Sequence, residues 1–388
     1  MLSRSGPPST AIRRVDRNET NPALSTRRLK LGTFQTNLDS GCVMADLDGR
    51  LDISWPNTVT LARLADEMEF ECLVPVARWK GFGGKTNPQG TGFETYTWAA
   101  GVSALTRYSS IVSTSHVMLN HPIIAAKQGL TIDHIGGGRF TLNIVCGWNG
   151  PEMAMFDTAL QGHDERYACA DEWVTIVRRL WTEDEPFDFE GRFYTVKGAV
   201  LNPKPIQRPY PVIMNAGGSD RGRHFAVKNC DLVYTSIRTH DLDVNKAHVE
   251  AYRRLAREDY GRDIQVWSLA NIVQAETEKE ARDFYNYLVN ERGDWDAAFN
   301  VVDAMSADVN ERHYPPERRK AMAEMLIAGW GGFPLIGTRE QIVDGLAILS
   351  KIGLDGLLLA FPLYEQGMRD FRDTTLPLVK QAGLRDFL

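Results

Sequence analysis

The sequence lacks the patterns that mark a metal centre or a hydrolytic active site. Its five cysteines are scattered and include no C-x-x-C pair, and His116 and His121 do not have the helical i, i+4 spacing of paired metal ligands. No G-x-S-x-G elbow is present. No two carboxylates share an expected strand end, as glycoside hydrolysis would require. We therefore expect no metal ion and no hydrolytic machinery built from side chains alone.

Long apolar runs and an excess of positive charge are also missing. No apolar stretch approaches the roughly 20 residues that span a bilayer, so no membrane association is expected. The net charge is −6, from 50 acidic and 44 basic residues, which argues against a general nucleic-acid binder. An odd number of scattered cysteines fits a reducing compartment. These features predict a cytoplasmic protein that acts on a small molecule.

Short β-rich runs alternate with amphipathic helical stretches over most of the 388 residues. The expected strands are Leu29–Gln35, Glu71–Val76, Ser110–His116, Phe140–Cys146, Pro211–Asn215, Asp231–Thr235, Gln265–Val273 and Gly356–Phe361. The clearest helices are Asn57–Phe70, Pro122–Ile135, Arg166–Trp181 and Arg339–Ile352. Eight strands separated by helices predict an α/β fold, with a parallel sheet closed into a (β/α)8 TIM barrel.

Two parts of the chain depart from this alternation. Residues 1–28 contain six arginines among Ser, Pro, Thr and Asn, without the apolar core of a signal peptide. We interpret them as a flexible N-terminal arm, with an intersubunit contact as the alternative. Residues 29–388 are expected to form one barrel domain, with an insertion at about 280–335 between the seventh and eighth strands. That insertion is expected to be a lid or a subunit contact.

The turn Gly217-Gly218-Ser219 follows the apolar run Val212-Ile213-Met214 and precedes a helical stretch. Two glycines let the backbone approach an anion, and a helix N-terminus offers free N–H groups and a positive dipole end. A plain loop is the alternative for such a turn. No G-x-G-x-x-G fingerprint follows any strand. The sequence therefore favours the single phosphate of FMN over a dinucleotide.

The residues at the expected strand ends are mostly neutral, and they include Thr114 and Asn143. A site that is poor in acids, bases and nucleophiles indicates that a bound cofactor performs the chemistry. Arg166 and Tyr167 begin a helix and supply a cation and a phenol for a phosphate near Ser219. A surface ion pair is the alternative for Arg166. Further candidates are the amide of Asn143, for the polar edge of an isoalloxazine ring, and the Ala77-Arg78 segment, for its other side.

Several motifs occur in order along the chain. They are Lys80-Gly81-Phe82-Gly83-Gly84-Lys85-Thr86, Thr131-Ile132-Asp133 through Gly137-Gly138-Arg139-Phe140, Asn143-Ile144-Val145-Cys146-Gly147-Trp148 with Pro151-Glu152, His163-Asp164-Glu165-Arg166-Tyr167, Gly217-Gly218-Ser219 and Leu335-Ile336-Gly337-Thr338-Arg339-Glu340-Gln341-Ile342. Together they resemble the bacterial-luciferase-like flavin monooxygenases, in the branch of the pyrimidine, dimethylsulfone and alkanesulfonate monooxygenases. The resemblance runs from about Leu29 to the C-terminus.

The resemblance implies a role for individual residues. The positions expected to contact the flavin are Ala77, Arg78, Asn143, Glu152, Arg166, Tyr167 and Ser219, with Gly217 and Gly218 in the phosphate turn. Thr114 and Asn143 match the catalytic positions beside the oxygen pocket. Trp79, Phe82 and Trp148 are expected to line the substrate pocket and keep water out; core packing is the alternative for Trp148.

The resemblance also implies a reaction. Reduced FMN, delivered by a separate NAD(P)H-dependent flavin reductase, would react with O2 to form a flavin peroxide that oxygenates a small organic substrate. Whether oxygen adds at N5 or C4a is not decided by these residues. Members of this superfamily are commonly dimers or tetramers, so a homodimer or homotetramer is expected. Two other functions stay open, namely a deazaflavin-dependent oxidoreductase and a flavin-binding protein without turnover.

The substrate is less defined than the cofactor. The segments Gln35–Cys42 and Asp46–Asp52 depart from the pattern of the pyrimidine enzyme, and so does the insertion at 280–335. Both regions are expected to border the substrate. These departures argue against ring cleavage of uracil and leave a sulfonate, a sulfone or another heterocycle open as the substrate.

Overall fold

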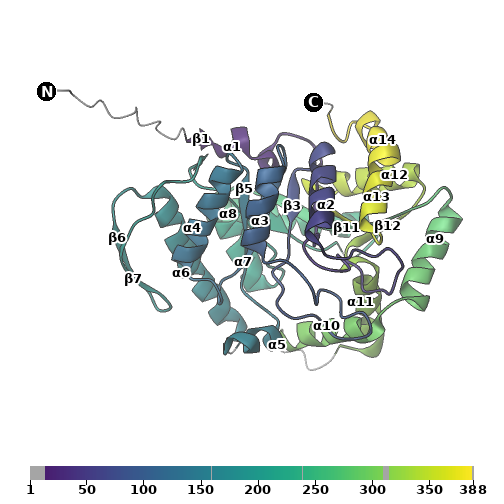
Figure 1. The fold of residues 1–388 in the computed structure, drawn as a ribbon, viewed down its shortest axis with the longest axis horizontal. Helices are drawn as coiled ribbons and strands as arrows, with labels where there is room; N and C mark the ends of the chain where they lie inside the picture. Colours follow the sequence, from purple (N-terminus) through teal and green to yellow (C-terminus); the bar gives the residue numbers. More distant parts are fainter. Residues whose placement is uncertain (1–13, 159, 238, 309–313, 387–388) are drawn as a thin grey trace.

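A computed structural model describes residues 14–158, 160–237, 239–308 and 314–386 (Figure 1). Eight parallel strands form a closed barrel, and each lies within two residues of a predicted strand at both ends. They are β2 (Lys30–Phe34), β3 (Cys72–Val74), β4 (Ser110–His116), β5 (Phe140–Val145), β9 (Val212–Asn215), β10 (Leu232–Tyr234), β11 (Gln265–Gln274) and β13 (Gly356–Ala360). They pair in the order β10-β9-β5-β4-β3-β2-β13-β11, and pairing of β10 with β11 closes the ring. The predicted (β/α)8 barrel is confirmed.

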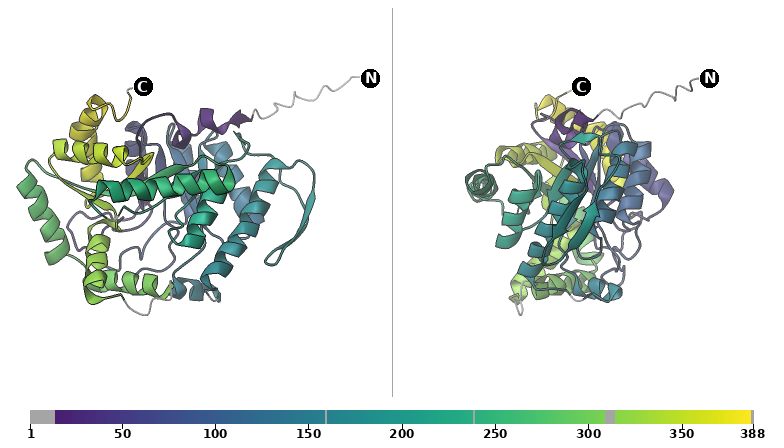
Figure 2. Two further views of the ribbon diagram at one scale, coloured as in Figure 1. Left: turned by 180° about the vertical axis from the view of Figure 1, so that it is seen from behind. Right: turned by 90° about the vertical axis from the view of Figure 1, so that its left-hand side faces the viewer.

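Helices surround the barrel on all sides (Figure 2). The main ones are α2 (Trp55–Glu67), α3 (Thr95–Leu105), α4 (Pro122–Ile135), α6 (His163–Thr182), α7 (Asp220–Asn229), α8 (Leu242–Tyr260), α12 (Arg339–Lys351), α13 (Tyr364–Asp370) and α14 (Leu376–Gln381). Their ends follow local sequence rules. Ser54 caps α2 ahead of a proline at its start, Thr338 and Gln341 form a capping box on α12, and α8 ends at Gly261 with φ +60°.

The insertion forms a helical layer over the carboxyl ends of the strands. It contains α9 (Glu278–Asn286), a π-turn at Tyr287–Glu291, α10 (Trp295–Asp308) and α11 (Pro316–Gly329). The strand β12 (Phe333–Gly337) then pairs with the distal half of β11, outside the barrel. In Figure 1, α10, α11 and the short α5 (Gly150–Met153) lie toward the bottom and α9 lies at the right, whereas α1 (Arg17–Thr20) and α14, near the two ends of the described chain, lie at the top.

The insertion is joined to the loops that follow β2 and β3. Its helices share a second hydrophobic cluster with Met44, Leu47 and Phe82. Asp294 accepts hydrogen bonds from the Thr86 N–H at 2.6 Å and from the Thr86 hydroxyl at 2.8 Å. The Asn300 amide donates to the Phe82 carbonyl at 2.8 Å. Three segments that are distant in sequence therefore cover the barrel mouth as one packed layer.

Residues 14–28 lie against the barrel, whereas the sequence predicted a flexible arm over all of 1–28. The strand β1 (Val15–Asp16) pairs with β8 (Gln207–Arg208), and Arg17 forms an ion pair with Asp231 at 2.8 Å. Arg27 is bound to the fully buried Glu71 at 2.8 Å. Residues 1–13 of the predicted arm lie outside the described residues.

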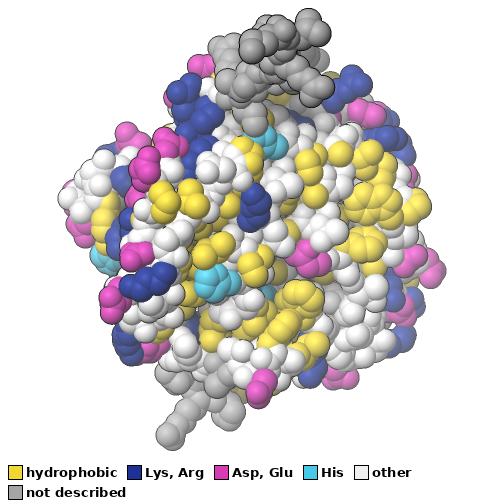
Figure 3. Space-filling view, turned by 60° about the vertical axis from the view of Figure 1, so that its left-hand side comes forward, with side chains coloured by type: hydrophobic (Ala, Val, Ile, Leu, Met, Phe, Trp, Pro, Cys, Tyr) yellow, Lys and Arg dark blue, Asp and Glu magenta, His cyan; other side chains and the backbone are white. Residues whose placement is uncertain are grey.

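The surface shown in Figure 3 carries apolar side chains across its middle and charged side chains toward its edges. Helix α4 alone exposes Ile124 at 56% and Ile135 at 44%. Scattered exposed apolar residues are ordinary for a folded chain, so the expected homodimer or homotetramer stays a prediction. Within the described part of the chain, no helix combines the length and apolar character that a membrane crossing requires.

Candidate functional site

The barrel mouth is built from side chains at the ends of neighbouring strands. Thr114 on β4 lies opposite Asn143 on β5, and Asn143 lies opposite Met214 on β9. The Asn143 amide donates to the Thr114 hydroxyl at 3.0 Å, and that hydroxyl donates its proton to the Pro75 carbonyl at 2.6 Å. Both side chains are buried, at 7% and 5% exposure. The structure thus brings the two predicted catalytic residues together, with Thr114 holding Asn143.

Two buried polar atoms in this region have no hydrogen-bond partner among the described residues. One is Oδ1 of Asn143, and the other is Nδ1 of His116, two residues beyond Thr114 on β4. Because side chains alternate along a strand, His116 points to the same side as Thr114. Buried polar atoms are normally hydrogen-bonded. Their presence at the mouth fits the binding of a polar group there.

Burial and the nearby positive charge of Arg78 lower the pKa of His116 to about 3. The imidazole is therefore neutral at ordinary pH. Burial also raises the pKa of the Cys146 thiol just beyond β5, so no thiolate is available there. The described side chains at the ends of β4 and β5, Thr114, His116, Asn143 and Cys146, are thus neutral groups.

Arg78 is held rigidly beside the mouth. Its guanidinium pairs with Glu152 of α5 at 3.1 Å and donates to the Gln89 amide oxygen at 3.0 Å. Its charge lies over the rings of Phe82, at 4.7 Å, and Trp148, at 5.4 Å. The second Glu152 oxygen accepts from the Trp79 N–H at 2.6 Å. Glu152 therefore positions Arg78, which the sequence assigned to the flavin together with Ala77, and the backbone of Trp79, which it assigned to the substrate pocket. Because the Arg78–Glu152 ion pair is buried, the cost of removing both charges from water offsets much of their attraction. The clearer effect of the pair is to fix the position of the Arg78 side chain.

The predicted phosphate turn leaves open space at one glycine. Ser219 caps α7, its hydroxyl accepting from the Gly222 N–H at 3.0 Å, and the Gly217 N–H donates to Asn215 at 2.7 Å. A Cβ on Gly217 would lie 2.4 Å from the Gly222 carbonyl oxygen, so that position requires glycine. A Cβ on Gly218 would meet nothing within 4 Å. Gly218 therefore faces the space in which a ligand can approach the helix N-terminus.

Tyr167 and Arg166 reach two different loops. The Tyr167 hydroxyl lies at the first turn of α7, since a Cβ on Gly222 would be 2.4 Å from it, and its ring packs on Phe225. The buried Arg166 guanidinium donates to the Gly147 carbonyl in the loop after β5. The structure thus brings Tyr167 to Ser219 and places Arg166 under the neighbouring loop.

The three aromatic residues predicted for the substrate pocket do not lie together. Phe82 and Trp148 stack with their ring centroids 6.1 Å apart, and Trp330 of the insertion lies 5.7 Å from Phe82. These rings sit under the helical layer. Trp79 instead is 44% exposed and makes an edge contact with Phe156 at 5.2 Å. The structure places Trp79 at the outer rim.

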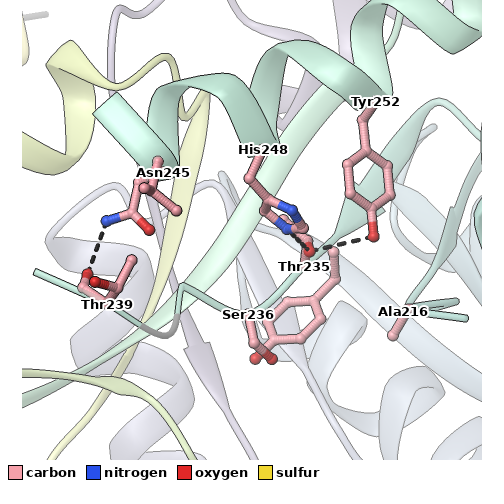
Figure 4. Close-up of a pocket in the computed structure, with 10 residues that line it drawn as sticks. Ala216, Thr235, Ser236, Thr239, Asn245, His248 and Tyr252 are labelled. Atoms are coloured by element: carbon pink, nitrogen blue, oxygen red, sulfur yellow. Dashed lines mark hydrogen bonds between the residues drawn. The ribbon is translucent and has the colours of Figure 1, made fainter. Parts of the chain in front are cut away.

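A cavity of 410 Å³ lies between the ends of β9 and β10 and the first half of α8. Figure 4 shows Thr235, His248 and Tyr252 converging in its wall, with Ala216 nearby. The sequence analysis assigned no role to these α8 residues. A signal was available, because Asn245, Val249, Tyr252 and Ala256 form the buried stripe of α8, and two of the four are polar.

The chain matches the family of luciferase-like monooxygenases over residues 23–356 and belongs to that family. It is 29% identical to an FMNH2-dependent dimethylsulfone monooxygenase of Pseudomonas putida, covering 91% of this chain and 96% of the relative. It is 28% identical to a pyrimidine monooxygenase of Acinetobacter baylyi, covering 90% and 95%. A crystal structure of a riboflavin lyase with modified FMN and riboflavin has the same fold, with a TM-score of 0.81, 20% identity and 92% coverage of each chain. The resemblance inferred from the motifs is confirmed, and the protein is a monooxygenase by family.

Proposed function

We propose that this protein is the oxygenase of a two-component, FMNH2-dependent system. It would receive reduced FMN from a separate NAD(P)H-dependent flavin reductase and transfer one atom of O2 to a small organosulfur compound or N-heterocycle. The observation that carries this proposal is the pair of buried atoms, Asn143 Oδ1 and His116 Nδ1, that have no partner among the described residues and lie at neutral strand-end side chains. The similarity to relatives named for FMNH2 dependence supports it.

The described residues fit both the phosphate end and the ring end of FMN. Gly218, Ser219 and Tyr167 would hold its phosphate at the N-terminus of α7, and Arg166 of α6 would contribute charge from its place under the loop after β5. Asn143 would bind the polar edge of the ring, and the Ala77-Arg78 segment, held by Glu152, would line its other side. Bound reduced flavin supplies the electrons that activate dioxygen, which side chains cannot do.

The chain's own contribution is binding, orientation and exclusion of water. Thr114 fixes the Asn143 amide so that one N–H and Oδ1 remain for the bound group. The packed rings of Phe82, Trp148 and Trp330 separate the mouth from solvent. A dry site with preoriented neutral groups stabilises developing charge without offering a proton that would release hydrogen peroxide.

The test is turnover with reduced FMN under oxygen, using dimethyl sulfone, methanesulfonate and uracil as substrates and mass spectrometry to read products. We expect an oxygenated product from at least one of these classes. The same protein with NADH and substrate alone should be inert, because the chain has one phosphate turn and no dinucleotide fingerprint. Robust NADH oxidation without a reductase would overturn the two-component proposal. Reduced deazaflavin in place of FMNH2 tests the hydride-transfer alternative.

Binding of FMN with no oxidation of any compound would favour the third possibility, a flavin-binding protein. The cytoplasmic location is likewise part of this proposal. It is supported by five described cysteines that are all free thiols.

A further inference from the structure

The cavity beside α8 has a wall of fixed polar groups. The Thr235 hydroxyl is 2.8 Å from Nε2 of His248 and donates to the Tyr252 hydroxyl oxygen at 3.2 Å. The Asn245 amide donates to the Thr239 carbonyl at 2.8 Å, which fixes a second side chain in the same wall. Figure 4 shows these contacts as dashed lines between α8 and the segment that follows β10. The groups are therefore oriented before any ligand binds.

Counting protons leaves one donor for a ligand. A threonine hydroxyl has a single proton, and Thr235 donates it to Tyr252, so His248 must carry a proton on Nε2 and donate it to Thr235. The Tyr252 oxygen accepts, and its own proton has no acceptor among the residues that the structure describes. Tyr252 is only 1% exposed. A buried tyrosine hydroxyl usually finds a partner for its proton.

The cavity lies beside the proposed flavin site. Ala216 and Gly218 of the phosphate turn form one of its walls, and Tyr234 at the end of β10 forms another. Its volume of 410 Å³ is within the usual range of small-molecule sites. A substrate of a flavin enzyme must reach the flavin ring. The end of β9 borders the cavity, and β9 pairs with β5 at Asn143, the residue proposed for the polar edge of that ring.

We propose that the cavity is the substrate pocket and that Tyr252 donates a hydrogen bond to a sulfonyl or carbonyl oxygen of the substrate. Thr235 and His248 act as positioning residues that hold the phenol with its proton toward the ligand. This inference rests on the proposed function. Sulfones and pyrimidines both present such acceptor oxygens, so the hydrogen-bond chemistry is shared by the two substrate classes.

The test compares Tyr252→Phe with wild type. The substitution removes the donor and keeps the ring that packs on His248 at 5.4 Å. Because a hydrogen bond contributes about 0.5–1.5 kcal/mol, KM for the accepted substrate should rise about two- to tenfold while the Kd for FMNH2 stays within twofold. Tyr260→Phe is the matched control. That tyrosine lies on the same helix and bonds to His224 at 3.0 Å, outside the cavity, so KM should not change.

Thr235 provides the test of the positioning role. Thr235→Val should raise KM in the same direction, and Thr235→Ser, which retains the hydroxyl, should restore the wild-type value. A general loss of folding would not be rescued by serine in this way. An increase in KM that is equal in the valine and serine variants would contradict the proposed hydrogen-bond chain.

A binding measurement separates this inference from the proposed function. Equilibrium dialysis of dimethyl sulfone, methanesulfonate and uracil against protein loaded with oxidised FMN requires no turnover. We expect at least one probe to bind wild type and to bind Tyr252→Phe more weakly, even if no product forms. Weakened FMN binding by Tyr252→Phe would assign the cavity to the flavin and overturn the inference. Equal probe binding by both proteins, or no binding to wild type, would also overturn it.

Discussion

The contact between Thr114 and Asn143 allows a sharp test of how the mouth is organised. Thr114→Val has a similar shape but lacks the hydroxyl that accepts from Asn143 at 3.0 Å and donates to Pro75 at 2.6 Å. It leaves a buried carbonyl and a buried N–H without a partner, each costing about 1–3 kcal/mol of stability. Thr114→Ser keeps both bonds and serves as the control.

The catalytic effect follows from the orientation of Asn143. Removing a preorganised donor lowers the rate by about a hundred- to a thousandfold, so Asn143→Ala should lose most of its product yield. Thr114→Val keeps the amide and releases its anchor, so its yield should fall between those of Asn143→Ala and wild type. The assay measures product and hydrogen peroxide formed per FMNH2 consumed, alongside FMNH2 affinity. Hydrogen peroxide should rise as product falls, with little change in affinity. Wild-type coupling in Thr114→Val would refute the reasoning.

Three further perturbations test other parts of the site. Arg166→Ala should weaken FMN binding about ten- to a hundredfold, because a charge-assisted hydrogen bond contributes about 1.5–3 kcal/mol; fluorescence titration measures this, and wild-type affinity would exclude Arg166 from the phosphate site. Gly218→Val should weaken FMN binding similarly, since its side chain would enter the open space at the turn; an unchanged Kd would place the phosphate elsewhere. His116, with its pKa lowered to about 3, stays unprotonated in the native state while the unfolded chain gains a proton below about 6.5, so its burial costs stability as pH falls. Urea unfolding at pH 7 and pH 5 should show wild type losing about 2 kcal/mol more than His116→Gln, and equal losses would contradict the buried neutral assignment.

The barrel strands were predictable because each carries its own short apolar run bounded by turns. The strand-to-helix turn proposed for the phosphate was also readable as a turn, since its glycines and Ser219 are consecutive in the chain. The position of β12 was not, because it pairs with β11 beyond the barrel and its register depends on the packing of the insertion. Residues 14–28 look like a polar arm in isolation, and partners distant in sequence, among them Gln207, Asp231 and Glu71, hold them against the barrel.

Within the site, the sequence predicted which residues take part better than it predicted where their side chains point. Phe82 and Trp79 occupy the same loop, yet only Phe82 turns under the insertion, because the Trp79 backbone is fixed by Glu152. The role of Thr114 also depends on geometry, since its single proton is already donated to the Pro75 carbonyl. A polar residue at the end of a barrel strand indicates a nearby site. Whether its side chain donates to a ligand, accepts from it or holds another side chain depends on contacts with residues from other strands and loops.

The most direct test of the central claim is isotope transfer from 18O2. Protein with one equivalent of photoreduced FMN and an accepted substrate is mixed with 18O2, without any reductase or NADH, and the product is analysed by mass spectrometry. We predict one 18O atom per product molecule and oxidised FMN at the end of a single turnover. Product that takes its oxygen from water, or substrate oxidised without gaining oxygen, would contradict the assignment of this protein as an FMNH2-dependent monooxygenase.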